Sequence, residues 1–86
     1  MIVHVGSILH AYTDGRSRVE AQGETVAGVL DALERACPGL RFRVVDEQGA
    51  IRPHIRMFLG SQPVRDLETS VGSERELHIL GALSGG

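Results

Sequence analysis

Apolar and polar residues alternate along the first quarter of the chain, and this pattern predicts two β-strands. Residues 2–9 open with Val3 and Val5 on one face and polar or small residues on the other, as expected of a strand buried on one side. Residues 18–22 alternate in the same way. The segment between them contains an Asp-Gly pair, which tolerates positive φ in a tight turn. We therefore expect the two segments to form an antiparallel hairpin.

The next segment has the spacing of an amphipathic helix. Its apolar residues recur at intervals of three and four positions and form one stripe: Val26, Val29, Leu30, Leu33 and Cys37. Thr25 can cap the amino end of this helix, and Pro38-Gly39 supplies a stop at the other end. The sequence therefore predicts one main helix between these signals.

The second half of the chain is expected to be mainly β-structure. Residues 40–45 (LRFRVV) alternate and are rich in β-forming residues, which predicts a strand. The remaining predicted elements, in order, are a loop at 46–49, a strand at 55–59, a turn at 60–63, a short helical turn or loop at 65–73 that packs Leu67 and Val71, and a last strand at 76–80.

A hairpin, a helix and then further strands indicate an α+β roll. A right-handed crossover through the helix would bring the last strand beside the first. The helix would then cover one face of a mixed sheet and leave the other face open to solvent. We expect that open face to be the docking surface for a partner.

Composition narrows the class of protein. The 86 residues, 42% hydrophobic and 23% charged, fit one small globular domain. No apolar run reaches the roughly 18 residues of a membrane span, and no signal peptide precedes the first strand, so we expect a cytoplasmic protein without a membrane partner. A net charge of −2 and the absence of Trp argue against nucleic acid as the partner.

Candidates for catalysis or metal binding by the chain itself are few. His4 and His78 fall in the first and last strands and are expected to be neighbours, but two histidines provide half of a tetrahedral zinc shell. No Cys or carboxylate accompanies them at ligand spacing in the sequence. Cys37 is expected to be a small buried hydrophobe. We therefore expect no catalytic residue and no metal site, with the four histidines exposed or partly buried in strands and loops.

The sequence ends on Leu83-Ser84-Gly85-Gly86, shortly after the last predicted strand. Glycine tolerates almost any φ and ψ, so this end could thread into the active site of another protein. We expect Gly81 to mark the end of the strand. The expected organisation is a domain at 1–81 and a flexible tail at 82–86.

The whole chain resembles a known family in the order of its elements and in particular segments. These segments are the opening hairpin, the ETVAGVLDAL start of the helix (24–33), the FLGSQPVR turn (58–65) and the terminal diglycine. They are similar to the ubiquitin-like β-grasp sulfur carriers: the small subunit of molybdopterin synthase, the thiamin-biosynthesis carrier and the carrier of the thiocarboxylate-dependent cysteine pathway. The extended segment at 46–55 is closer to the molybdopterin and cysteine-pathway types.

The resemblance implies a carrier without catalytic machinery or a bound cofactor. An E1-like enzyme would adenylate the carboxyl group of Gly86 with ATP and Mg²⁺, and a sulfur donor would convert it to a thiocarboxylate. A sulfur-acceptor enzyme, of the molybdopterin synthase large subunit or cysteine synthase type, would then receive the sulfur. Gly85 and Ser84 would thread the tail into these enzymes.

By the same resemblance, the partners would dock on the open sheet face around Phe58, Leu59 and Leu80. Because Phe58 and Leu59 are adjacent in one strand, they point to opposite faces, and only one of them can serve the docking surface. Arg52, Arg56 and Arg65 could steer an acidic partner or simply be solvated.

Two other functions remain open at this point. A protein modifier would be activated identically but would be joined through Gly86 to lysines of its targets. The chain itself contains no Lys, so Lys-linked chains of this protein are excluded. A β-grasp interaction domain with an inert tail would tolerate deletion of Gly85 and Gly86.

Overall fold

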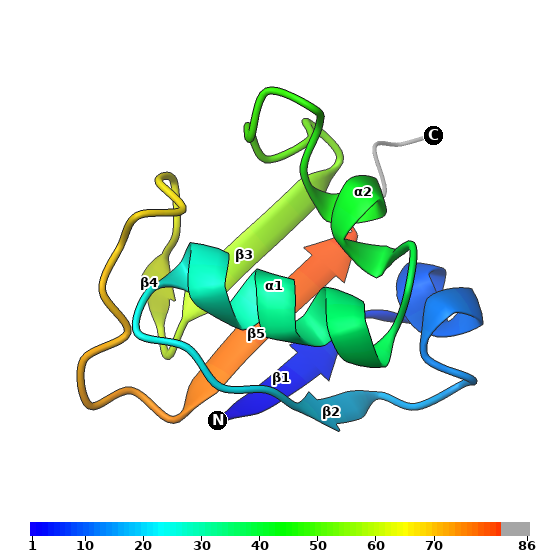
Figure 1. The fold of residues 1–86 in the computed structure, drawn as a ribbon, viewed down its shortest axis with the longest axis horizontal. Coiled ribbons are helices and arrows are strands. Elements are labelled where there is room, and N and C mark those ends of the chain that lie inside the picture. Colours follow the sequence, from blue (N-terminus) through cyan, green and yellow to red (C-terminus); the bar gives the residue numbers. More distant parts are fainter. Residues whose placement is uncertain (82–86) are drawn as a thin grey trace.

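The computed structural model describes residues 1–81 of the chain; the predicted tail at 82–86 lies outside the described residues (Figure 1). The elements, in order, are β1 (Ile2–Val5), the 3₁₀ helix η1 (Ser7–Tyr12), β2 (Arg18–Glu20), α1 (Val26–Ala36), α2 (Leu40–Val44), β3 (Ile55–Leu59), β4 (Gln62–Pro63) and β5 (Glu76–Gly81). No helix within this part of the chain is long and apolar enough to cross a membrane.

The strands form one five-stranded mixed sheet in the order β2-β1-β5-β3-β4. β1 pairs antiparallel with β2 and parallel with β5, and β3 pairs antiparallel with both β5 and β4. The predicted hairpin and the predicted pairing of the last strand with the first are therefore both confirmed. β5 lies in the middle of the sheet, between β1 and β3.

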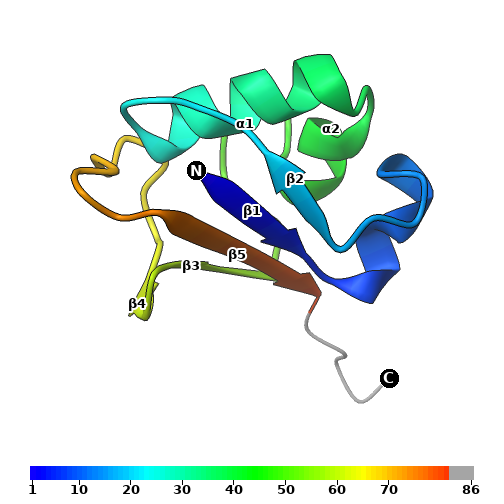
Figure 2. The same ribbon diagram turned by 90° about the horizontal axis from the view of Figure 1, so that it is seen from below.

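The main helix packs on one face of this sheet, as predicted (Figure 2). All five residues of the predicted apolar stripe are buried: Val26, Val29, Leu30, Leu33 and Cys37. The Oγ1 of Thr25 accepts a hydrogen bond from the backbone N–H of Gly28 at 3.1 Å, so Thr25 is the N-cap. Both α1 and α2 lie on this side of the sheet, and the opposite face carries no helix within the described residues.

The first strand is shorter than predicted. It ends at Val5, and Gly6 leads into η1 instead of a continued strand. Within η1, Leu9 turns into the core with 2% of its surface exposed. The ring Nε2 of His10 lies 2.9 Å from the carbonyl oxygen of Val5, which helps to hold this turn against the end of β1.

The predicted strand at 40–45 is wrong, because residues 40–44 form the short helix α2. Gly39 adopts φ of 94°, a left-handed conformation that lets the chain turn sharply after α1. Leu40 and Val44, four positions apart on one helical face, are then both fully buried. The alternation of apolar and polar residues at 40–45 is typical of a strand. One turn of helix, however, buries Leu40 and Val44 equally well.

A carboxylate from α1 holds the start of α2. The two side-chain oxygens of Glu34 accept hydrogen bonds from the backbone N–H groups of Gly39, at 2.8 Å, and Arg41, at 2.9 Å. These backbone hydrogen bonds hold the pKa of Glu34 below its usual range. Glu34 thus satisfies two amide groups that a helix start would otherwise leave without partners.

The segment before β5 is the predicted loop, and its packing is confirmed. Leu67 and Val71 are buried. The carbonyl oxygens of Leu67 and Thr69 accept hydrogen bonds from the first amide groups of α1, at 2.8 and 3.0 Å. The loop therefore fixes the amino end of the main helix.

Replacing Glu34 by Gln should destabilise the protein at neutral pH and much less in acid. A carboxyl group whose folded-state pKa is lowered contributes stability above its unfolded-state pKa, and this contribution is lost as the pH falls through the folded-state value. Urea unfolding at pH 7 and at pH 3 measures the difference between wild type and E34Q. A difference that stays constant across this range would contradict the assignment.

Candidate functional site

The open face of the sheet carries the side chains that a partner would meet. Alternation along the strands turns Val3, Val5, Leu77 and Ile79 toward the helices, where they are buried. The residues between them point to the other face: Ile2 and His4 on β1, Arg56 and Phe58 on β3, and Glu76, His78 and Leu80 on β5. This set is called the open face below.

The three residues predicted for docking do not all lie on the open face, as the alternation of side chains along β3 requires. Leu59 is 6% exposed and belongs to the core, so its assignment to the docking surface is corrected. Phe58 lies on the open face and is half-buried. Leu80, also on the open face, is 41% exposed. Phe58 and Leu80 remain the predicted docking residues.

A second exposed apolar residue, Ile8, lies beside Gly81. Gly81 belongs to β5 and is the last of the described residues, so its role as the end of the strand stays a prediction. Its missing side chain leaves room for Ile8 of η1: a Cβ on Gly81 would overlap Ile8 Cδ1 and lie 2.6 Å from Cγ1. Ile8 is 46% exposed and lies against the described end of β5. No periodicity in the sequence pointed to Ile8.

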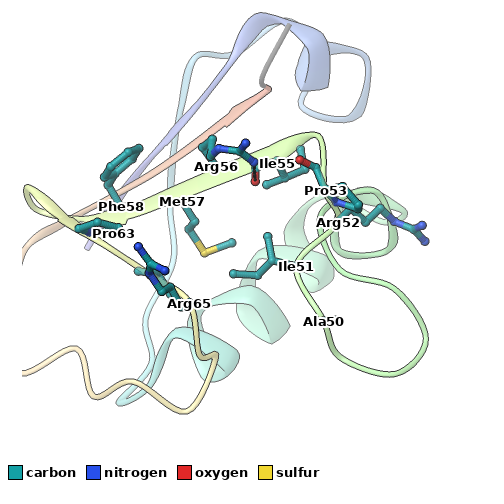
Figure 3. Close-up of a pocket in the computed structure, with 11 residues that line it drawn as sticks. Ala50, Ile51, Arg52, Pro53, Ile55, Arg56, Met57, Phe58, Pro63 and Arg65 are labelled. Atoms are coloured by element: carbon teal, nitrogen blue, oxygen red, sulfur yellow. Dashed lines mark hydrogen bonds between the residues drawn. The ribbon is translucent and has the colours of Figure 1, made fainter. Parts of the chain in front are cut away.

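The three arginines considered for steering a partner line one pocket of about 490 Å³ (Figure 3). Arg52, Arg56 and Arg65 are among its lining residues, together with the apolar residues Ile51 and Met57. The side chain of Arg56 lies on the opposite side of β3 from Met57, and that of Arg52 points away from both apolar residues. The guanidinium group of Arg52 also lies over the ring of Phe42, 4.7 Å from its centroid. The three guanidinium groups therefore do not converge on one point, and a steering role for these arginines remains a prediction.

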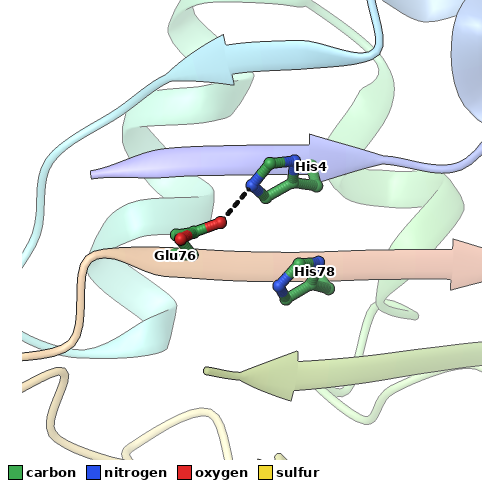
Figure 4. A group of neighbouring side chains, drawn as sticks. All are labelled: His4, Glu76 and His78. Atoms are coloured by element: carbon green, nitrogen blue, oxygen red, sulfur yellow. Dashed lines mark hydrogen bonds and ion pairs between the residues drawn. The ribbon is translucent and has the colours of Figure 1, made fainter. Parts of the chain in front are cut away.

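His4 and His78 are neighbours, as predicted, and a carboxylate lies with them (Figure 4). Their rings stack with centroids 4.6 Å apart and planes inclined by 10°. Glu76 Oε1 lies 2.6 Å from His4 Nε2. The expectation that no carboxylate accompanies these histidines is therefore wrong: Glu76 lies two positions before His78 and on the same face of β5, and strand pairing brings His4 beside both.

The predicted tail residues Ser84, Gly85 and Gly86 lie outside the described residues. The structure does describe β5, the strand that precedes them. β5 is the central strand of the sheet, and Ile8 packs against its described end at Gly81.

Solved structures of similar fold cover nearly the whole chain. The chain of an Amycolatopsis orientalis BexX/CysO complex matches with a TM-score of 0.90 and 33% identity, over 99% of this chain and 98% of that one. CysO of Mycobacterium tuberculosis matches with a TM-score of 0.88 and 26% identity, over 95% and 98%. SAMP1 of Haloferax volcanii matches with a TM-score of 0.77 and 30% identity, over 100% and 98%.

The sequence comparison agrees with the structural one. The chain is 28% identical over 89 aligned positions to the sulfur carrier protein CysO of Mycobacterium tuberculosis, covering 98% of this chain and 96% of the relative. No protein-family profile matches. The sheet order, the packed helix and these neighbours define a ubiquitin-like β-grasp protein. Within that class, the chain belongs to the family of ubiquitin-like sulfur carriers.

Replacing Gly81 by Ala should destabilise the protein, since the new methyl group overlaps Ile8. Replacing Ile8 by Ala as well should recover most of the loss, giving a coupling free energy of about 0.5–3 kcal/mol in a double-mutant cycle. Chemical denaturation of wild type, both single variants and the double variant measures it. Additive effects of the two substitutions would show that Ile8 does not pack on Gly81.

Proposed function

We propose that this sulfur carrier is activated at the carboxyl group of Gly86 and that the sulfur travels as a Gly86 thiocarboxylate. An E1-like enzyme transfers AMP from Mg²⁺-bound ATP to the carboxylate and releases pyrophosphate. A sulfur donor then attacks the acyl-adenylate, so that a C–S bond forms, the C–O bond to phosphate breaks and AMP leaves. Adenylation is needed because a free carboxylate has no good leaving group.

One observation carries this proposal: the likeness to sulfur carriers extends over essentially the entire chain and includes the strand that leads into the diglycine. A central strand gives the segment after it a fixed starting point. In this proposal the chain supplies the group that reacts and the surface that partners recognise. ATP, Mg²⁺ and sulfide chemistry belong to the partners, and the chain has no catalytic residue of its own.

The proposed partners are an E1-like adenylating enzyme, a sulfur donor and a sulfur-acceptor enzyme. The acceptor would act in the biosynthesis of molybdopterin or of cysteine. The structure of a BexX/CysO complex supports the idea that a protein of this fold assembles with a second protein. Docking through the open face at Phe58 and Leu80 would place the partner beside the end of β5.

A protein modifier is the second candidate function. SAMP1 of Haloferax volcanii, a small archaeal modifier protein by name, shares the fold over the whole chain at 30% identity. Activation would begin in the same way, but an amine of a target protein would attack the adenylate in place of sulfide. The fate of Gly86 distinguishes the two functions.

Incubation with the cognate E1-like enzyme, ATP, Mg²⁺ and sulfide should replace one oxygen atom of the protein by one sulfur atom. Intact mass spectrometry detects this exchange. The variant that lacks Gly86 should keep its fold, by circular dichroism, and show no exchange. An amide adduct would support the modifier function. An unchanged mass with an E1-like enzyme that is active on another carrier would overturn both.

Replacing Leu80 by Ala should weaken the complex with the E1-like enzyme and leave the fold intact. Truncating an apolar residue at the centre of an interface costs about 1–2 kcal/mol or more of binding free energy. The matched control is Phe42→Ala, since Phe42 is also exposed, at 55%, but lies on α2. Isothermal titration calorimetry compares the two. Equal affinities of both variants and wild type would remove Leu80 from the docking surface.

A further inference from the structure

We propose that His4, Glu76 and His78 on the open face form a binding site for a divalent transition-metal ion such as Zn²⁺. One ring nitrogen of each histidine and one carboxylate oxygen of Glu76 all lie within 4.8 Å of one another (Figure 4). Two imidazoles and one carboxylate are a donor set typical of zinc with an open fourth position. The proposal is independent of what happens at Gly86.

The pairing of the two central strands produces this grouping. In the parallel register between β1 and β5, His4 lies directly opposite His78, and Glu76 is two positions earlier on the same face of β5. Both strands have hydrogen-bonded neighbours on each side. The three side chains therefore project from strands that are hydrogen-bonded on both sides, which holds their backbone positions fixed for ligand binding.

The side chains are accessible and need only small movements to bind a metal ion. Imidazole nitrogens and carboxylate oxygens bind zinc at about 2.0–2.2 Å, which places ligand atoms roughly 3.3 Å apart in a tetrahedral shell. His4 Nε2 and Glu76 Oε1 are already closer than this, at 2.6 Å, so a metal ion would replace their hydrogen bond. The two rings are nearly parallel and must tilt toward each other, which the broad χ2 torsion of histidine allows.

The charged side chains around the group are of both signs. On β3, Arg56 lies diagonal to His78 on the same face, but its guanidinium group donates hydrogen bonds to the carbonyl oxygens of Pro53 and Ile55. On β2, Arg18 lies opposite His4 and Glu20 lies opposite Ile2, so one positive and one negative side chain flank the group from that strand. Leu80 and Phe58 follow on the same face. A partner that docks there could donate the fourth ligand, while the free protein would fill this position with water.

The metal site exists only in the folded protein, because His4 and His78 are separated by nearly the whole chain. An ion that binds the native state and not the unfolded state stabilises the protein by an amount that grows with the logarithm of the free ion concentration relative to the dissociation constant. This gives the proposal a readout that does not depend on sulfur transfer.

Titration of the full-length protein with ZnCl₂, followed by calorimetry, should show saturable binding of one ion per chain. His78→Ala and Glu76→Gln should each weaken this binding by at least about tenfold, because each removes a ligand. His54→Ala is the matched control: His54 is exposed, lies outside the cluster and should leave the affinity unchanged. Thermal melts with and without ZnCl₂ should show stabilisation in wild type and H54A only.

The backbone NMR spectrum of each variant reports whether its fold is intact. If loss of a histidine disturbs the sheet, Glu76→Gln still tests the site, because glutamine preserves the shape of the side chain. Zinc-induced shifts should centre on β1 and β5. Absence of saturable binding, equal binding by wild type and H78A, or loss of binding in H54A would each overturn the proposal.

Discussion

The parallel pairing of β1 with β5 is the contact on which the rest of the molecule depends. It joins the two ends of the described chain and makes β5 the centre of the sheet, with a strand on each side. Val3, Val5, Leu77 and Ile79 on this pair form the floor on which α1 packs. The same register sets which side chains meet on the opposite face. The core, the open face and the starting point of the segment after Gly81 therefore all follow from one pair of strands.

The local signals of the sequence were sufficient for most of the fold. The helix was predictable because its stripe, its N-cap at Thr25 and its Pro-Gly stop all agree, and the hairpin because its alternation and its turn agree. The residues at 40–44 show the limit of such patterns. A run of five residues with two buried positions fits a strand or one helical turn, and the choice depended on Gly39 and on the carboxylate of Glu34 in another element.

Residues of the site were predictable only where alternation within a single strand determines which way their side chains face. Alternation within β3 correctly required Phe58 and Leu59 to face opposite sides, although it could not tell which of them faced the core. Alternation also puts Glu76 and His78 on one face of β5. The contact between Ile8 and Gly81 and the approach of His4 to Glu76 and His78 are different in kind. They depend on the register and on the path of η1, which are tertiary properties without a periodic trace in the sequence.

The central place of β5 also bears on how the protein is made. Ribosomes release a chain from its amino end, so β1 and its hairpin partner emerge long before the strand that joins them to β3. Until residues 76–81 are available, the sheet lacks its middle and α1 has only part of its floor. The domain therefore completes its fold as its final strand is inserted. A nascent chain that stops before this strand would leave apolar surface exposed to chaperones and proteases. Only chains synthesised past residue 81 can therefore bury this surface and escape them.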